Sequence, residues 1–287
     1  MTHPASAAAP PTPAQQQLAA TFDALYAARA RTDLVARLYA AAMGENYPHE
    51  VSASSSCDWP LLGLMVARLR MRPGQLLIDA GCGTGGVGLW LARALAVRLV
   101  GIDISPVAVA KATARRTRFV TAGRASFRVG TLQATGLSTG HADGIVCVDA
   151  LSFAADRGAA LIELGRVLAP GARLVCTRAL RHGAEPAWGD QARAAGLVVE
   201  HVDERPHEPT MWQRLYGLWR NHEAELRREL DKDQVENMLA EAHRKLPTLP
   251  GRRAVLLTLK RPAAPPAADR MTSPDNGPAS LNERTPR

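Results

Sequence analysis

Short apolar runs alternate with amphipathic stretches through the middle of the chain. Apolar runs of strand length, rich in Val, Leu and Ile, occur at 76–80, 98–103, 125–130, 144–149 and 172–178. Stretches with apolar positions at helical spacing occur at 85–96, 106–117, 155–168 and 187–195. Continuously apolar strands separated by helices are typical of a parallel sheet covered on both faces. The pattern therefore predicts a doubly wound α/β domain over residues 76–261.

Two helical patterns precede the first predicted strand. From residue 16 to residue 42 apolar side chains recur at helical spacing, and residues 61–70 predict another helix. A polar stretch that includes the sequence GENYPHE separates the two. We expect residues 15–75 to form a helical cap and a loop in front of the sheet.

A long helical segment interrupts the end of the sheet. A sixth strand is expected at 197–206 and a seventh at 252–261, and the segment 209–246 between them has helical periodicity. Asp233 and Glu236 predict a capping box at the start of its second helix. Because a hairpin of a few residues could join the two strands, we expect this segment to be a lid over an acceptor pocket. Replacing it with a short turn should then spare cofactor binding.

Both ends of the chain differ from the middle in composition. Residues 1–14 and 262–287 are rich in Ala, Pro, Ser and Thr and carry few large apolar side chains. Such segments bury too little apolar surface to fold, so two disordered tails are expected.

Composition and charge exclude some classes of protein. The chain is 46% hydrophobic and 22% charged, and no run approaches the ~20 apolar residues of a membrane span. The first residues lack the basic and apolar segments of a secretory signal. Cys57, Cys82, Cys147 and Cys176 have no metal-like spacing, which predicts free thiols in a cytoplasmic protein. The net charge of +8 raises the question of nucleic acid, but the basic run at 111–124 has no aromatic cluster beside it.

A glycine loop follows the first strand in LLIDAGCGTGG. Gly81, Gly83 and Gly86 fit G-x-G-x-x-G, and Asp103 ends the next strand about 20 residues later. This spacing alone suits a nicotinamide dinucleotide, because Asp103 can accept hydrogen bonds from a ribose diol. Asp79 argues against it, since a carboxylate beside the loop would repel a pyrophosphate and attract a cationic amine. S-adenosylmethionine has such an amine, a ribose and no phosphate.

The loop and its context resemble class I S-adenosylmethionine-dependent methyltransferases. The resemblance rests on DAGCGTG at 79–85, on VGIDIS with Asp103, and on DRGAALIELGRVLAPGARL after the fourth strand. The last segment departs from the family's pattern by Ala172 in place of a glycine. The resemblance implies a Rossmann-like, seven-stranded, mostly parallel sheet whose seventh strand is antiparallel. It also implies S-adenosylmethionine as the cofactor.

The resemblance assigns cofactor contacts to positions in this sequence. It implies that Asp79 and Gly81 lie near the methionine end and that Asp103 binds the ribose. The other expected contacts are Cys82, Gly83, Gly85, Ile104, Thr131, Leu132 and Asp149. Thr131 stands where such enzymes often have an acidic residue for the adenine amine, so its hydroxyl or the Leu132 backbone N–H would take that contact.

The acceptor and any catalytic base are less defined. Ser152 and Phe153 stand where related small-molecule enzymes sometimes have a histidine pair, so no base carries over. The candidates for a base lie in or near the predicted cap and lid, which together would cover the acceptor. They are Glu45, His49, Glu50, His207, Glu208 and His222. Candidates for an apolar acceptor pocket are Tyr47, Trp59, Trp212, Tyr216 and Trp219.

Three functions remain open. VDALSF after the fourth strand is not the Pro-Pro-aromatic loop of nucleic-acid amino-methylating enzymes, and the cysteines are too scattered for zinc-dependent methylation. A small-molecule acceptor is therefore favoured. The alternatives are a nucleic-acid or protein methyltransferase, which steep salt dependence of RNA or DNA binding would support, and a non-catalytic cofactor-binding module. The acceptor atom (oxygen, nitrogen or carbon) and the oligomeric state stay open.

Overall fold

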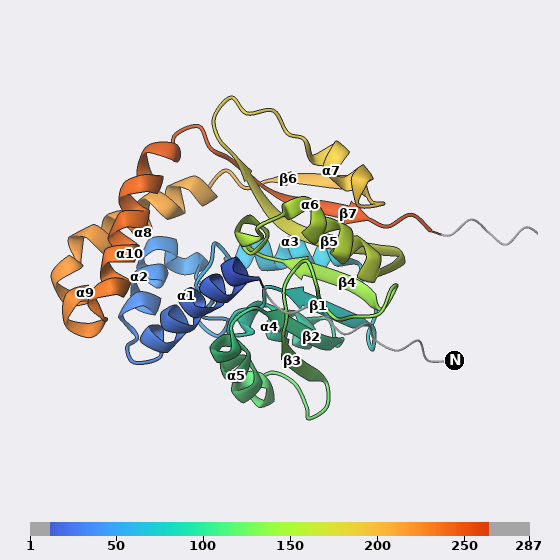
Figure 1. Ribbon diagram of the computed structural model, residues 1–287, viewed down its shortest axis with the longest axis horizontal. Helices are drawn as coiled ribbons and strands as arrows, with labels where there is room; N and C mark the ends of the chain where they lie inside the picture. Colours follow the sequence, from blue (N-terminus) through green and yellow to red (C-terminus); the bar gives the residue numbers. More distant parts are fainter. Residues whose placement is uncertain (1–11, 264–287) are drawn as a thin grey trace, which may run out of the picture.

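The computed structural model describes residues 12–263, which form an α/β domain beside a layer of helices (Figure 1). The strands are β1 Leu76–Ala80, β2 Arg98–Asp103, β3 Ala125–Val129, β4 Ala142–Cys147, β5 Leu168–Leu180, β6 Val198–Glu204 and β7 Arg253–Lys260. The helices of this domain are α3 Trp59–Leu69, α4 Gly86–Ala94, α5 Pro106–Arg115, α6 Arg157–Val167 and α7 Trp188–Ala194. The helical layer contains α1 Pro13–Arg29, α2 Leu34–Met43, α8 Glu208–Asn221, α9 Glu223–Glu229 and α10 Lys232–Lys245.

Within residues 12–263 the sheet has seven strands in the order β3-β2-β1-β4-β5-β7-β6. β1 to β5 are mutually parallel where they pair, and β7 runs antiparallel to both β5 and β6. The doubly wound, mostly parallel fold is therefore confirmed. β5 starts at Leu168, earlier than predicted, because Leu168 already pairs with Ala142 before a register shift in the β4–β5 ladder.

Apolar side chains on alternate positions of each strand enter different cores, as the period of a strand requires. One face of the sheet packs on α6 and α7 through Ile78, Ile145 and Cys176. The other face packs on α3 and α4 through Leu77 and Val175, among others. Both faces are thus covered, which explains why β1 is buried along its whole length.

A third core lies in the helical layer. The apolar face of α2, with Leu34 and Leu38, packs against Leu215 and Trp219 of α8 and Val235 of α10. The cap before the sheet and the insertion within it therefore share one core, although more than 160 residues separate them in the chain (at left in Figure 1). The sequence pattern predicts that the N-terminal helices and the insertion together cover the acceptor, and their shared core is the contact that joins them.

The structure corrects several predicted boundaries. Thr12 caps α1, its side chain accepting from the Gln15 backbone N–H, so residues 12–14 belong to the helix and not to a tail. The helical stretch from 16 to 42 is two helices, broken between Arg29 and Leu34. Residues 1–11 and 264–287 of the two predicted tails lie outside the described residues.

The insertion also differs from its prediction. It starts at Glu208 and contains α8, α9 and α10 in the described structure, where the sequence pattern predicted two helices. The predicted capping box at Asp233 and Glu236 is wrong, because α10 starts at Lys232 with Asp231 as its N-cap residue. Asp231 makes no side-chain capping hydrogen bond.

Cys57, Cys82, Cys147 and Cys176 are buried free thiols, as predicted. None of the helices described over residues 12–263 has the length and apolar character needed to span a membrane.

Candidate active site

The loop from β1 to α4 comes close to neighbouring side chains because its glycines have no Cβ. Gly81, Gly83 and Gly85 all have positive φ, of 78°, 52° and 78°, a conformation that favours glycine. A Cβ on Gly81 would lie 2.2 Å from the Cβ of Ala150, and one on Gly83 would lie 2.8 Å from the Tyr26 hydroxyl. The sequence DAGCGTG therefore produces a bare backbone surface at the end of β1.

Asp103 at the end of β2 supports this loop. Its Oδ2 accepts a hydrogen bond from the Gly83 backbone N–H at 2.7 Å, and its Oδ1 accepts one from the Ser105 N–H at 2.9 Å. Burial raises the pKa of this carboxyl, although the two backbone donors act in the opposite direction. Asp103 thus holds the glycine loop in place in addition to its expected contact with a ribose.

Asp79, the last residue but one of β1, is 2% exposed. It accepts one hydrogen bond from the Gly88 backbone N–H of α4 at 3.0 Å. A Cβ on Gly88 would lie 2.5 Å from Asp79 Oδ2, so this close approach also depends on a glycine. Burial raises the pKa of Asp79 to about 7, with the negative charge of Asp103 adding to the shift.

The loop opens into a cavity of about 1110 Å³ that extends to the helical layer. Nine of the ten predicted cofactor contacts line it: Asp79, Gly81, Cys82, Gly83, Asp103, Ile104, Thr131, Leu132 and Asp149. Gly85 does not, because it serves as the N-cap residue of α4 and packs toward Ala112 and Phe127.

Two polar residues in this wall are fixed by further hydrogen bonds. The Thr131 hydroxyl accepts from the Ala134 backbone N–H at 3.1 Å, which leaves one lone pair for another donor. Asp149, with φ of 52°, accepts from the Ser56 N–H at 2.6 Å and the Thr177 hydroxyl at 2.9 Å. Asp149 therefore joins the loop after β4 to β5 and to the loop before α3.

The far wall of the cavity comes from the insertion. Trp212, Tyr216 and Trp219 of α8 all line it, as the apolar stripe in the sequence predicts. Glu208 accepts from Trp212 Nε1 at 2.9 Å and from Arg252 Nη2 at 2.9 Å, so it is already paired. Glu241 of α10 accepts from the Tyr216 hydroxyl at 2.9 Å.

The first helix, α1, covers the glycine loop, a role not expected from its sequence. Phe22 and Tyr26 line the cavity, and the Phe22 ring meets the Phe153 ring edge-on at 5.2 Å. Asp23 accepts from the Ser105 hydroxyl at 2.5 Å and from the Val107 N–H at 3.2 Å, which ties α1 to the start of α5. The available signal was the spacing of Phe22 and Tyr26, four residues apart on one helix face.

The remaining sequence candidates lie elsewhere. Tyr47, His49 and Glu50 line an adjoining, smaller cavity of about 820 Å³, which shares Tyr26 and Thr84 with the first and in which Glu50 pairs with Arg93 at 2.6 Å. Trp59 is 38% exposed and packs edge-on against Trp90. The other residues that line neither of these two cavities are Glu45, His207 and His222.

The donors and acceptors at the loop fit S-adenosylmethionine. A buried carboxylate beside the loop suits an ammonium group, a second carboxylate at the end of β2 suits a ribose diol, and the bare glycine backbone leaves room for both. Asp79 disfavours a pyrophosphate in the same position, because an ionised carboxylate beside the loop repels it.

Comparison with known proteins gives the same assignment. Residues 78–176 match the family described as a methyltransferase domain. An O-methyltransferase of Pyrenophora dematioidea is 34% identical over 107 residues, which are 37% of this chain and 40% of that protein. The chain thus spans about 40% of the length of the curated relatives it matches first.

Solved structures share the fold over a larger part of the chain. The [4+2]-cyclase SpnF superposes with a TM-score of 0.68 at 21% identity, over 88% of this chain and 99% of that one. A putative sarcosine dimethylglycine methyltransferase from Galdieria sulphuraria superposes with a TM-score of 0.63 at 16% identity, over 71% and 84%. Residues 78–176 thus match a methyltransferase domain, and the larger part of the chain has the fold of these solved structures.

Proposed function

We propose that this protein transfers a methyl group from S-adenosylmethionine to a small molecule. The observation that carries the proposal is a single cavity that joins the glycine loop, Asp79 and Asp103 to the aromatic wall of the insertion. One end matches the cofactor, and the other leaves room for a second molecule under α8 and α10. The curated relatives are named O-methyltransferases, which favours an oxygen acceptor.

Each end of the cavity has a separate task. Asp79 would hold the cofactor's amine, Asp103 its ribose, and Thr131 with Leu132 its adenine. When bound, the sulfonium supplies an activated methyl group. The residues of α1 and α8 then exclude water and align the acceptor, which is the main requirement of an in-line displacement.

A hydroxyl acceptor must also lose a proton. The predicted bases His49, Glu50, His207 and His222 do not line this cavity. Glu241 does line it, and its hydrogen bond is to the neutral Tyr216 hydroxyl, not to a cation. We therefore assign Glu241 as the carboxylate that would receive the proton, and Glu241→Gln should lower the rate of methylation without changing cofactor affinity.

Calorimetry with S-adenosylhomocysteine and with NAD tests the cofactor assignment. We expect binding of the first and none of the second. Binding of NAD alone would remove the basis of the proposal. If S-adenosylhomocysteine binds but labelled methyl groups reach no small molecule, the protein is a cofactor-binding module or catalyses another reaction. The solved structure of the cyclase SpnF shows that this fold alone does not determine the reaction.

The variant Asp103→Asn tests the ribose contact. Asparagine can still accept from the Gly83 N–H, which keeps the contact with the loop, but its amide nitrogen cannot accept from the Ser105 N–H, and the charged hydrogen bonds to the ribose are lost. A loss of about 1.5–3 kcal/mol corresponds to roughly 10- to 100-fold weaker binding of S-adenosylhomocysteine. Asp190→Asn on the exposed face of α7 is the matched control and should leave the affinity unchanged.

A further inference from the structure

We propose that the acceptor carries an anionic group, a carboxylate or a phosphate, which binds to cationic side chains in the far wall of the cavity. The inference rests on the proposed function, because it concerns the acceptor end of the same cavity. It adds the charge and the chemical class of the acceptor, which neither the fold nor the glycine loop determines.

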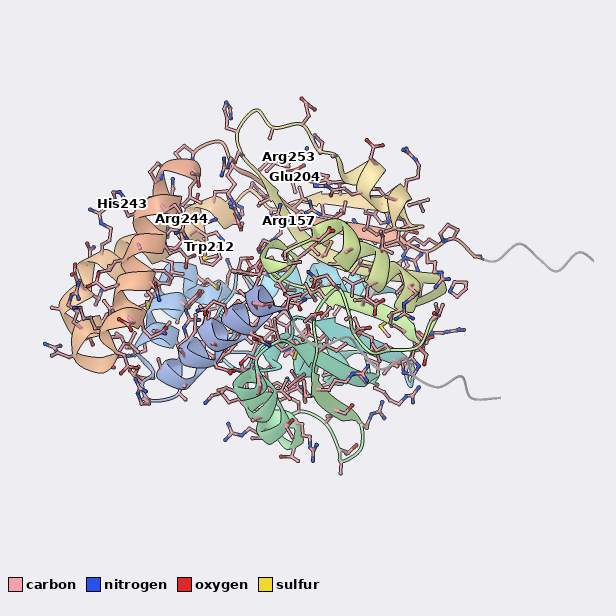
Figure 2. The ribbon with its side chains drawn as sticks, in the orientation of Figure 1. Arg157, Glu204, Trp212, His243, Arg244 and Arg253 are labelled. Carbon is pink, nitrogen blue, oxygen red and sulfur yellow. The ribbon has the colours of Figure 1, made fainter. Side chains whose placement is uncertain are left out.

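Cationic side chains outnumber carboxylates at this end of the cavity. Away from the glycine loop, seven cations line it: Arg157, Arg178, Arg181, Arg205, Arg244, Lys245 and Arg252. The carboxylates there are Asp149, Glu208 and Glu241. The cations come from both layers, since Arg157 begins α6 on the sheet side and Arg244 lies on α10, which packs against α8 in the helical layer (Figure 2).

Each of the three carboxylates already accepts at least one hydrogen bond from the protein. Glu208 binds Arg252 and Trp212, Asp149 binds Ser56 and Thr177, and Glu241 binds Tyr216. Among residues 12–263, no acceptor lies within hydrogen-bond or ion-pair distance of the Arg181, Arg244 or Lys245 side chains. The wall therefore has a surplus of positive charge that the protein itself does not neutralise.

Two buried donors that line the cavity, one on β5 and one on α8, point to an acceptor group in the ligand. Arg178 Nη2 donates to Gln191 at 3.1 Å, but Nη1 is buried without a partner among the described residues. Burial lowers the pKa of this guanidinium. Trp219, 1% exposed, likewise has an indole Nε1 with no partner in that part of the chain. A buried donor left unpaired is costly, so an anionic oxygen would satisfy what the protein leaves open.

The aromatic wall indicates the rest of the molecule. Trp212 and Tyr216 stack with ring centroids 5.5 Å apart, and Tyr216 meets Trp219 at 5.2 Å. Tyr216 and Trp219 are buried and hold Trp212 in place, and the partly exposed Trp212 ring suits an apolar or aromatic body, while the cations at the rim suit its charged end. The acceptor class is therefore an apolar or aromatic molecule with one anionic group.

Three naphthalene probes that differ in charge test this inference. Binding of 2-naphthoate, 1-naphthyl phosphate and the neutral 2-naphthalenemethanol would be measured by calorimetry at fixed ionic strength, on protein saturated with S-adenosylhomocysteine. We expect at least one anion to bind about tenfold or more tightly than the alcohol, because one charged hydrogen bond changes an affinity by about that factor. The stronger anion identifies the group, carboxylate or phosphate.

The double variant Arg244→Gln/Lys245→Gln localises the effect. It should reduce the preference for the anion to about threefold or less, while the affinity for S-adenosylhomocysteine stays unchanged. The matched control is Arg220→Gln/Arg228→Gln, which removes the same charge from exposed positions on α8 and α9 that do not line the cavity. The control should keep the full preference.

Several results would overturn the inference. Equal binding of the alcohol and the anions, or no anion binding to the saturated protein, would remove it. Anion binding that S-adenosylhomocysteine abolishes would place the cations at the cofactor's own carboxylate. Equal losses of the preference for the anion in both double variants would show an effect of the protein's net charge and not of Arg244 and Lys245. In each case cofactor binding persists and the proposed function stands, whereas failure to bind S-adenosylhomocysteine would overturn both.

Discussion

Asp79 shows how one buried residue can oppose folding and favour binding. With a pKa of about 7 in the folded protein against 3.8 for the free side chain, the folded state binds its proton more tightly than the unfolded state. The free energy of unfolding of the empty protein should therefore fall as pH rises from about 4 to 7. A bound ammonium reverses the preference, because it stabilises the ionised carboxylate.

The variant Asp79→Asn separates these two effects. Asparagine imitates the protonated acid, so the empty variant should be more stable at pH 8 by about 2–4 kcal/mol, given ~1.4 kcal/mol per pKa unit. Urea unfolding at pH 8 measures this change. The same variant should bind S-adenosylhomocysteine ~10- to 100-fold more weakly.

The wild-type protein supplies the control. Its affinity for S-adenosylhomocysteine should drop about tenfold between pH 8 and pH 6, because Asp79 takes up its proton over this range. An affinity that does not change with pH in the wild type would show that Asp79 is not opposite the amine.

Gly83→Ala tests the contact between α1 and the glycine loop. The new residue would be strained at φ of 52°, and its Cβ would lie 2.8 Å from the Tyr26 hydroxyl, so the Tyr26 side chain or α1 must move. We expect a loss of stability of about 1–3 kcal/mol and weaker cofactor binding. Adding Tyr26→Phe removes the hydroxyl and should restore part of both. If it restores neither, the strain is in the loop alone.

At this scale the sequence predicted most residues that line the cavity at the glycine loop and the aromatic residues of the far wall, but not Tyr26 or Arg178. Asp79, Gly81 and Asp103 follow apolar strands directly, so their place at the sheet edge depends on local sequence. Tyr26 and Arg178 reach the cavity only through packing between distant segments. No local pattern distinguishes an arginine in such a wall from a solvated one.

The insertion has two roles that its sequence did not separate. Its aromatic residues line the cavity, but Leu215 and Trp219 also complete the core that covers α2. The expectation that a short turn could replace 209–246 without effect on cofactor binding is therefore not supported. Its removal would expose Leu34 and Leu38 of α2 and take away the contact of α10 with α1, the helix that covers the glycine loop.

Point variants distinguish the two roles. Leu215→Ala should cost about 2–5 kcal/mol of stability, as for a fully buried leucine, and weaken cofactor binding as the helical layer loosens. Trp212→Ala, at a partly buried position in the cavity wall, should cost less and spare cofactor affinity. Thermal unfolding and calorimetry of both variants check this. Equal losses of cofactor affinity would show that Trp212 also supports the cofactor end.

The predicted start of a helix was wrong where its capping residues lie in a segment of biased composition. Thr12 and Gln15 form a capping box within a stretch rich in Ala and Pro, and the bias hid the start of α1. The β strands were easier to predict because each buried run is continuous and ends at a charged or glycine residue.

At the scale of the whole molecule, the cofactor cavity joins the sheet to the helical layer. S-adenosylhomocysteine at 100 times its dissociation constant should raise the free energy of unfolding by about 2.7 kcal/mol. Because α1 and α8 line the cavity with the glycine loop, hydrogen exchange should slow in all three segments. Protection confined to the glycine loop would mean that the helices do not close over the ligand.

The position of β7 affects how the protein is made. β6 pairs only with β7 within the described sheet, and β7 also pairs with β5, yet β7 is the last of these strands to be synthesised. A nascent chain that stops before Arg253 has a β6 with no partner and a β5 with an open edge, both prone to pair with other chains. The sheet can therefore close only after Lys260 has left the ribosome, and until then the growing chain should depend on chaperones.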